Sequence, residues 1–417
     1  MPRMLLSCWL LLATVAMSGC RLVEPAAYTF RMAAQTQADA PHREQYAVVD
    51  TPDSPQAEPL LRLLRFVPNT PDHRKWVAYG DSVAWHAAWG IARPTDFAGA
   101  EALPDSQRGM WYLMLTKQTT PPQALGAQYL AVAPMREFYG FGFFDADRFL
   151  EAGVPPQGVT VVETNVSPER LDAALRRSGY GATPLETGFT LYSMRGDHEA
   201  DLRSPEPVGR LGGLNRIAVS AGELVIAHAT APVLGALAAR QGGQMSLAAD
   251  PAYQAAVAVL DSPPLAAWGP PLGAIFIGEM LLADPLMVLG QELPDVQEQW
   301  RRYAQAPLPP YWLAAFYTQR ANDITYLSLV VVFLPGVDAA AAARLLGDRM
   351  ERYVSHVTGS TLDEWWSVNH ASGVEIGGQP VALVTMQAHD VLEARNQIGW
   401  NDLLARRDFA FVVAGGP

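Results

Sequence analysis

The chain has 417 residues, of which 49% are hydrophobic, and its formal net charge at pH 7 is −12. The length suits two domains or one large domain, and the hydrophobic content can fill a sizeable core, which excludes an intrinsically disordered protein. The acidic balance argues against nucleic acid as a partner and against binding to anionic lipid headgroups.

Residues 1–19 have the order of a secretory signal peptide. Arg3 supplies a basic start, residues 5–17 form an apolar run, and small residues precede Cys20. The run is shorter than the ~20 residues that a membrane-spanning helix needs. Met17-Ser18-Gly19-Cys20 resembles the lipobox of bacterial lipoproteins, in which the thiol takes a diacylglyceryl group and the chain is cut just before the cysteine. The alternative is an ordinary secretory signal that ends beside a chance cysteine.

The resemblance implies a lipid anchor, palmitate included, on Cys20, and a location on the extracytoplasmic side of a cell membrane or outer membrane. Two acyl chains hold a protein stably on a bilayer, whereas one binds only marginally. Arg21 follows the cysteine, where proteobacterial lipoproteins of the inner membrane resemble one another in having aspartate. An outer-membrane destination therefore stays open, and the choice of membrane is not decided.

Cysteine usage agrees with this expectation. Cys8 lies in the segment to be removed, and lipid would consume the thiol of Cys20. The mature chain would then have no free thiol, which excludes a disulfide, a zinc–thiolate site, an iron–sulfur cluster and a cysteine nucleophile. We expect no cofactor and no metal.

Residues 20–60 are polar and rich in Pro, Gln and Ala, without a sustained period, and this pattern predicts a flexible, lipidated tether. After it, segments with strand and helix patterns alternate. We expect a first domain over residues 61–300 and a second, similar domain over residues 301–417.

The clearest unit of the first domain begins with a β-branched strand at residues 159–162. Ser167 then provides an N-cap, Pro168 the first helical position and Glu169 an acid in the first turn, and Gly179 can end the helix in a left-handed conformation. The elements expected next are a strand at residues 189–194, a hairpin over residues 217–227 and a helix from Thr230 to about Arg240.

The last third of the chain repeats this order. The expected elements are strands at residues 311–318 and 324–334, a long helix opened by Asp338, strands at 373–376 and 380–387, a helix at 401–406 and a final strand at 409–413. Both stretches therefore predict an α+β fold built from duplicated β-α-β-β-type units, with mostly antiparallel sheets and helices packed on one face.

One segment carries a second resemblance. Gln241-Gly242-Gly243, followed by Ser246-Leu247-Ala248-Ala249-Asp250-Pro251-Ala252-Tyr253, resembles a unit found in uncharacterised bacterial envelope lipoproteins, Gly-Gly-x-x-Ser-Leu-x-x-Asp-Pro-x-Tyr. Asp250 can cap and Pro251 can open the helix that follows, so local physics explains the pattern without a ligand. The resemblance implies no known activity.

Gly80-Asp81-Ser82 is the motif closest to a catalytic one. It resembles the nucleophile block of lipolytic serine hydrolases of the Gly-Asp-Ser type, which need a histidine to deprotonate the serine. The only Asp-x-x-His pattern, Asp39 to His42, precedes the serine, so the order is wrong for that family. A turn or helix start that leads into Val83 is the favoured interpretation.

The other candidate sites are incomplete. His198-Glu199 begins like a zinc-protease helix, but Leu202 stands where the second ligand is required. His370 and His389, with Glu375 or Asp390, would bind a metal only if two strands brought them together in register. Asp145 is interpreted as an N-cap for residues 148–150, and the glycine-rich residues 208–213 as a turn entering a strand.

Trp365 and Trp366 are the aromatic residues most suited to binding, because two adjacent residues of one helix or strand cannot both face one core. We expect one of them to be exposed or covered by another element. Exposed tryptophans bury much area at low entropic cost when a partner binds.

Three functions remain in order of preference. The first is a tethered extracytoplasmic lipoprotein with a non-catalytic binding or scaffolding role and an envelope protein as partner. The second is a solute-binding lipoprotein of a transporter, which predicts two lobes around a cleft. The third is a hydrolase that uses Ser82.

Overall fold

The computed structural model describes residues 56–113, 132–154, 156–201, 203, 212–243, 245–278, 294–356, 358–389, 399–405 and 408–414. The expected signal peptide, Cys20 and nearly all of the expected tether lie outside these residues. Within them, no helix combines the length and the apolar character needed to cross a membrane. They belong to one compact unit.

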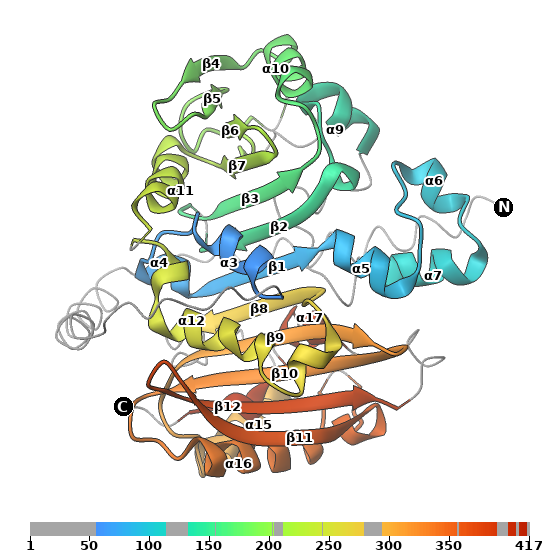
Figure 1. The fold of residues 1–417 in the computed structure, drawn as a ribbon, viewed down its shortest axis with the longest axis vertical. Coiled ribbons are helices and arrows are strands. Elements are labelled where there is room, and N and C mark those ends of the chain that lie inside the picture. The colour runs from blue at the N-terminus through green and yellow to red at the C-terminus, as the bar shows by residue number, and fades with distance from the viewer. Residues whose placement is uncertain are drawn as a thin grey trace. The chain divides into compact units, whose positions relative to one another are not determined.

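Among the described residues, twelve strands form one sheet in which neighbouring strands run antiparallel (Figure 1). The α+β class and the antiparallel pairing predicted from the sequence are therefore confirmed. The strands, in sheet order, are β11 (Trp366–Ile376), β12 (Gln379–Ala388), β10 (Ile324–Phe333), β9 (Tyr311–Ala321), β8 (Gly273–Gly278), β1 (Trp76–Asp81), β2 (Ala146–Ala152), β3 (Val159–Thr164), β7 (Glu223–Ala227), β6 (Arg216–Ser220), β5 (Thr190–Ser193) and β4 (Gly181–Pro184).

The sheet continues across residue 300, where the sequence suggested a domain boundary. Strand β8 pairs with β1 on one side and with β9 on the other, so both expected domains contribute to a single sheet. The strand order outward from this centre is similar in the two directions. From β1 it runs through β2, β3, β7 and β6, and from β8 through β9, β10, β12 and β11. In both halves a helix follows the third strand, α10 after β3 and α16 after β10. A later hairpin then places its second strand beside that third strand: β6–β7 places β7 beside β3, after the additional hairpin β4–β5, and β11–β12 places β12 beside β10.

Helices cover both faces of the sheet, where the sequence analysis expected them on one. We call the two the α12 face and the α16 face. The α12 face packs against α3 (Glu58–Leu64), α11 (Thr230–Gly242) and α12 (Pro251–Ala258). The α16 face packs against α9 (Val132–Tyr139), α10 (Pro168–Arg177), α15 (Pro294–Ala304), α16 (Ala339–Glu351) and α17 (Trp400–Ala405). The other α-helices of the described part of the chain are α4 (Pro71–Arg74), α5 (Ser82–Trp89), α6 (Phe97–Glu101) and α7 (Asp105–Leu113).

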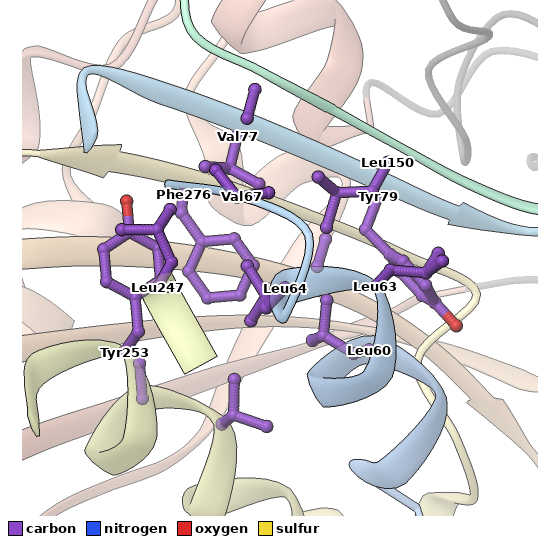
Figure 2. Close-up of a cluster of buried hydrophobic side chains, with 14 of the residues drawn as sticks. Leu60, Leu63, Leu64, Val67, Val77, Tyr79, Leu150, Leu247, Tyr253 and Phe276 are labelled. Atoms are coloured by element: carbon purple, nitrogen blue, oxygen red, sulfur yellow. The ribbon is translucent and has the colours of Figure 1, made fainter. Parts of the chain in front are cut away.

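The core on the α12 face lies over the centre of the sheet. Leu60, Leu63 and Leu64 of α3 are fully buried, and they lie beside Tyr79 of β1 and Phe276 of β8 (Figure 2). Spacings of three and four residues place the leucines on one side of the helix. Burial of each leucine contributes about 1.5–3 kcal/mol, so the short helix is held by packing rather than by its own helical propensity.

Local sequence signals placed several helices correctly. The Ser167 hydroxyl accepts a hydrogen bond from the backbone N–H of Arg170, and α10 starts at Pro168. Gly179 follows the helix with φ +91°, a left-handed conformation that suits glycine. Asp250 caps α12 through Ala252 N, and Asp338 caps α16 through Ala341 N.

Two local predictions fail. Residues 410–412 form a 3-10 turn rather than a strand, because only Ala414 makes a bridge, to Leu308. Asp145 does not cap a turn at residues 148–150, which belong to β2. Its carboxylate instead accepts hydrogen bonds from Gly142 N at 2.9 Å and from Arg136.

Edge strand β11 packs closely on α16. A Cβ atom added to Gly373 would lie 2.2 Å from the backbone nitrogen of Ala340, far inside contact distance. Glycine is therefore required here, because it allows the backbones of strand and helix to touch.

Candidate functional site

Ser82 opens α5, directly after β1. Asp81 caps this helix by accepting a hydrogen bond from Ala84 N at 2.7 Å, as the helix-start interpretation of Gly80-Asp81-Ser82 predicted. The Ser82 side chain is buried, and its Oγ lies 3.4 Å from Nδ1 of His86, one turn later. The structure therefore places an imidazole beside the serine that the sequence singled out.

This imidazole is engaged elsewhere. Nδ1 of His86 lies only 2.6 Å from the backbone carbonyl oxygen of Ser82, so this nitrogen carries a proton and donates it to the carbonyl. Burial lowers the pKa of His86, which keeps the ring neutral and leaves one N–H. A nitrogen that already carries its proton cannot take a second one from Ser82. The geometry needed for a general base is thus missing at this pair.

Asp81 also begins a row of charged side chains on the α12 face. Arg148 Nε donates to Asp81 Oδ2 at 2.7 Å, and its Nη1 donates to Glu163 Oε2 at 3.1 Å. Arg62 of α3 completes the row by donating from Nε to Glu163 Oε1 at 2.5 Å. Burial alone would lower the pKa of Arg148, but the two carboxylates outweigh it and raise this pKa. The row compensates its own charge and fastens α3 to three adjacent strands.

The tryptophan pair is less exposed than expected. Trp366 begins β11 and is only 3% exposed, and Trp365 is half-buried against the same core on the α16 face. Trp365 has a helical backbone (φ −115°, ψ −32°) at the end of a 3-10 turn, so the chain bends between the two residues. Because they belong to different elements, both side chains can face one core, and the reason for treating them as an exposed pair is removed.

The histidines of the suggested metal site are not brought together. His370 lies opposite Thr385 of β12, four residues before His389, and Glu375 lies opposite Pro380. At about 3.3 Å per residue, the backbone positions of the two histidines are separated by roughly 13 Å along the strand direction. Asp390 lies outside the described residues. In the described part of the chain, no three His, Cys, Asp or Glu side chains are grouped to hold a metal ion.

His370 has a different partner. Its Nε2 lies 2.8 Å from Oγ of Ser372, two residues further along β11, and both side chains are half-buried. Thr385, directly across the strand pair, donates a short hydrogen bond to Asn369 Oδ1. The sequence analysis missed Ser372, although residues i and i+2 of a strand share a face and a His-x-Ser pattern could have indicated it.

A buried carboxylate organises the end of the chain. Asp408 is completely buried and accepts hydrogen bonds from Tyr353 OH at 2.7 Å, Ser355 Oγ at 2.5 Å and the backbone N–H of His356 at 3.3 Å. Nδ1 of His356 also lies 2.8 Å from Oδ1 of the carboxylate. Both carboxylate oxygens are occupied, so this cluster fixes the segment after α16 against residues 408–411 and leaves no oxygen free for a ligand.

The turn after β5 contains His198, which does not lie on a helix. His198 has φ +61°, and its backbone N–H donates to the carbonyl of His228 at 3.2 Å. Asp197 Oδ1 accepts from the backbone N–H and the hydroxyl of Thr230 and pairs with Arg216 at 2.7 Å. The zinc-protease interpretation, already rejected from the sequence, has no helix to support it. Of the glycine-rich residues 208–213, only 212 and 213 are described, and they form a turn before β6.

Comparisons with known proteins assign no family to the chain. No family model and no curated protein matches it. Among solved structures, crystal form III of TP0453 aligns with 8% sequence identity and a TM-score of 0.30, over 80% of this chain and 96% of that one. Crystal form IV gives the same identity and TM-score over 79% and 95%. Likeness at this level carries no argument about function.

Proposed function

We propose that the protein is an extracytoplasmic lipoprotein, held to a membrane by lipid on Cys20, with a binding or scaffolding role rather than a catalytic role at the residues singled out from its sequence. The observation that carries the proposal is the run of Arg3, an apolar segment and Met17-Ser18-Gly19-Cys20. The described body begins at residue 56, which leaves residues 21–55 to link it to the lipid.

The buried polar groups described above are paired with one another, which argues against chemistry at these particular residues. Nδ1 of His86 donates to the backbone carbonyl of Ser82, and Asp81 forms an ion pair with Arg148. Both carboxylate oxygens of Asp408 accept hydrogen bonds. The hydrogen-bonding atoms of these groups are engaged within the protein, where they contribute to stability.

The solute-binding alternative is less well supported. Lobes of transporter-associated binding proteins are built on parallel sheets around a cleft. The described residues instead form one antiparallel sheet whose central strands β1 and β8 pair directly at five positions from Trp76 to Gly80.

Metabolic labelling with palmitate tests the anchor. The chain is expressed in a bacterium with its leader intact, and the label is expected on the wild-type protein and on Cys8→Ser, the matched control within the leader. Cys20→Ser is expected to lose the label and to keep its leader, because the thiol is the acceptor. Label retained on Cys20→Ser would overturn the proposed anchor.

The binding role needs a separate measurement. The tethered protein is cross-linked in intact cells and purified from detergent-solubilised membranes, and one envelope protein is expected to co-purify at a constant ratio. Recovery of the protein alone in repeated preparations, with no bound molecule in native mass spectra, would contradict the binding role and leave the anchor unaffected.

A further inference from the structure

A β-bulge at Asn369 re-aims the side chains of the edge strand β11. The register with β12 shifts between Val368 and His370, so Asn369 has no directly opposed partner. Before the bulge, Trp366 and Val368 face the core that α16 covers. A regular strand would send His370 to that same face, but the extra residue reverses the alternation.

After the bulge, His370 and Ser372 lie on the α12 face. Val374 and Ile376 continue their alternation and pack on the core of that face, whereas Gly373 approaches α16 on the other side. The i, i+2 spacing brings the imidazole beside the serine hydroxyl, and the bulge places both on the face that α16 does not cover. Bulges are over-represented at sheet edges and beside functional sites, where they re-aim a side chain in this way.

The Ser372–His370 pair differs from the two other contacts between a hydroxyl and an imidazole among the described residues, Ser82 with His86 and Thr70 with His73. Nδ1 of His86 is held by a carbonyl, and the His73 ring, beside the Thr70 hydroxyl at 2.8 Å, is buried. In the His370 tautomer with its proton on Nδ1, Nε2 accepts the Ser372 proton at 2.8 Å. Both residues are only half-buried, so a reagent can approach.

We propose that Ser372 is a nucleophile that accepts an acyl group from an activated ester, with His370 as its general base. Oγ of Ser372 attacks the ester carbonyl carbon while Nε2 of His370 takes the hydroxyl proton. The bond from that carbon to the alcohol oxygen then breaks, and the alcohol leaves with the proton from Nε2. The products are acyl-Ser372 and the free alcohol, so no oxidant, reductant or metal is required.

The acylated state is expected to persist. In serine hydrolases a carboxylate orients the base histidine, and backbone N–H groups stabilise the oxyanion during both acylation and deacylation. Among the described residues, the His370 ring bonds to Ser372, and no carboxylate accepts a hydrogen bond from it. An activated ester has a good leaving group, whereas acyl-Ser372 is an ordinary ester with a poor one, so deacylation without these groups is the slower step. The site therefore captures one acyl group rather than turning over, which goes beyond the proposed binding role and does not rest on the lipid anchor.

The test treats the purified full-length chain with 4-nitrophenyl acetate. Release of 4-nitrophenolate is followed by absorbance, and the acetylated position is located by peptide mass mapping. Background acylation of amines is small, because Lys75 and Lys117 are the only lysines of the chain. Ser372→Ala and His370→Ala are compared with Ser82→Ala, the matched control at the engaged pair, after thermal melting has shown that all three variants are folded.

The wild type and Ser82→Ala are expected to release one equivalent of 4-nitrophenolate rapidly and to carry one acetyl group on Ser372. Ser372→Ala is expected to lose the rapid phase. His370→Ala is expected to slow it about 100-fold, the usual contribution of a positioned base. An acetyl group that never appears on Ser372 would overturn the proposal. An unchanged rate of 4-nitrophenolate release in His370→Ala would also overturn it, because the imidazole would then not act as the base for Ser372.

Discussion

Replacement of Asp408 tests whether the buried carboxylate holds the end of the chain in place. Asp408→Ala removes the acceptor for Tyr353, Ser355 and the backbone of His356, and the partner of the His356 imidazole, in a position with no exposed surface. A buried donor left without an acceptor costs about 1–3 kcal/mol. Because water can enter the vacated space, we expect a total loss of about 4 kcal/mol in the free energy of unfolding.

Asp408→Asn keeps the shape of the side chain and one acceptor oxygen but removes the charge. Charge-assisted hydrogen bonds are roughly twice as strong as neutral ones, so the expected loss is smaller, about 1–2 kcal/mol at pH 7. Urea unfolding of the purified chain, followed by tryptophan fluorescence, measures both variants. Asp363→Ala is the matched control, because Asp363 is exposed in the same region and its loss is expected to change stability by less than about 0.5 kcal/mol.

The pH dependence of this difference has a defined sign. Burial raises the pKa of Asp408, but hydrogen bonds from His356, Ser355 and Tyr353 outweigh burial and hold it below its ordinary value of 3.8. The ionised carboxylate therefore contributes stability that is fully present above pH 3.8 and is lost as the pH falls through the folded-state pKa. The wild type and Asp408→Asn should converge in stability below pH 3.8. A loss below about 1 kcal/mol in Asp408→Ala, or a gap that widens in acid, would refute the reasoning.

Two further variants test the packing of the sheet by thermal and urea unfolding. Gly373→Ala places a methyl group against the backbone of Ala340 and is expected to lower the free energy of unfolding by about 2–3 kcal/mol. Gly347→Ala on the facing helix meets only ordinary contacts, so this control should lose less than about 1 kcal/mol. Equal losses in the two variants would contradict the close approach of β11 to α16. Arg148→Met leaves the carboxylate of Asp81 buried without its ion pair and should lower the free energy of unfolding by about 3 kcal/mol. Arg148→Lys keeps the charge and should recover much of that loss. Full stability of Arg148→Met would show that the row of charged side chains is not required.

Signals that lie within a few residues of one another predicted local structure well. Ser167, Pro168 and Gly179 bracket α10 as expected, and Asp81 caps α5. Such signals act through hydrogen bonds between neighbours in the chain, so the sequence contains both partners side by side. The α+β class followed from the alternation of these elements.

Features that depend on distant pairing could not be derived in the same way. The pairing of β1 with β8 joins segments far apart in the chain, and no local pattern specifies it. The face of the sheet on which His370 and Ser372 lie could not be predicted, because the bulge at Asn369 reverses the alternation that begins at Trp366. The tryptophan pair was assigned to one element because the bend at Trp365 depends on the 3-10 turn before it.

The antiparallel pairing of β1 with β8 also closes the chain into a very long loop, over residues 82–272. The entropy lost on closure grows only with the logarithm of loop length, so this loop costs about 2 kcal/mol more than a 20-residue one. Five adjacent backbone pairs, from Trp76 with Ile277 to Gly80 with Gly273, and the leucines of α3 that lie over them offset that cost. The pairing of β1 with β8 is therefore stable at equilibrium. Contacts between segments distant in the chain form slowly, so we expect this pairing to form late in folding.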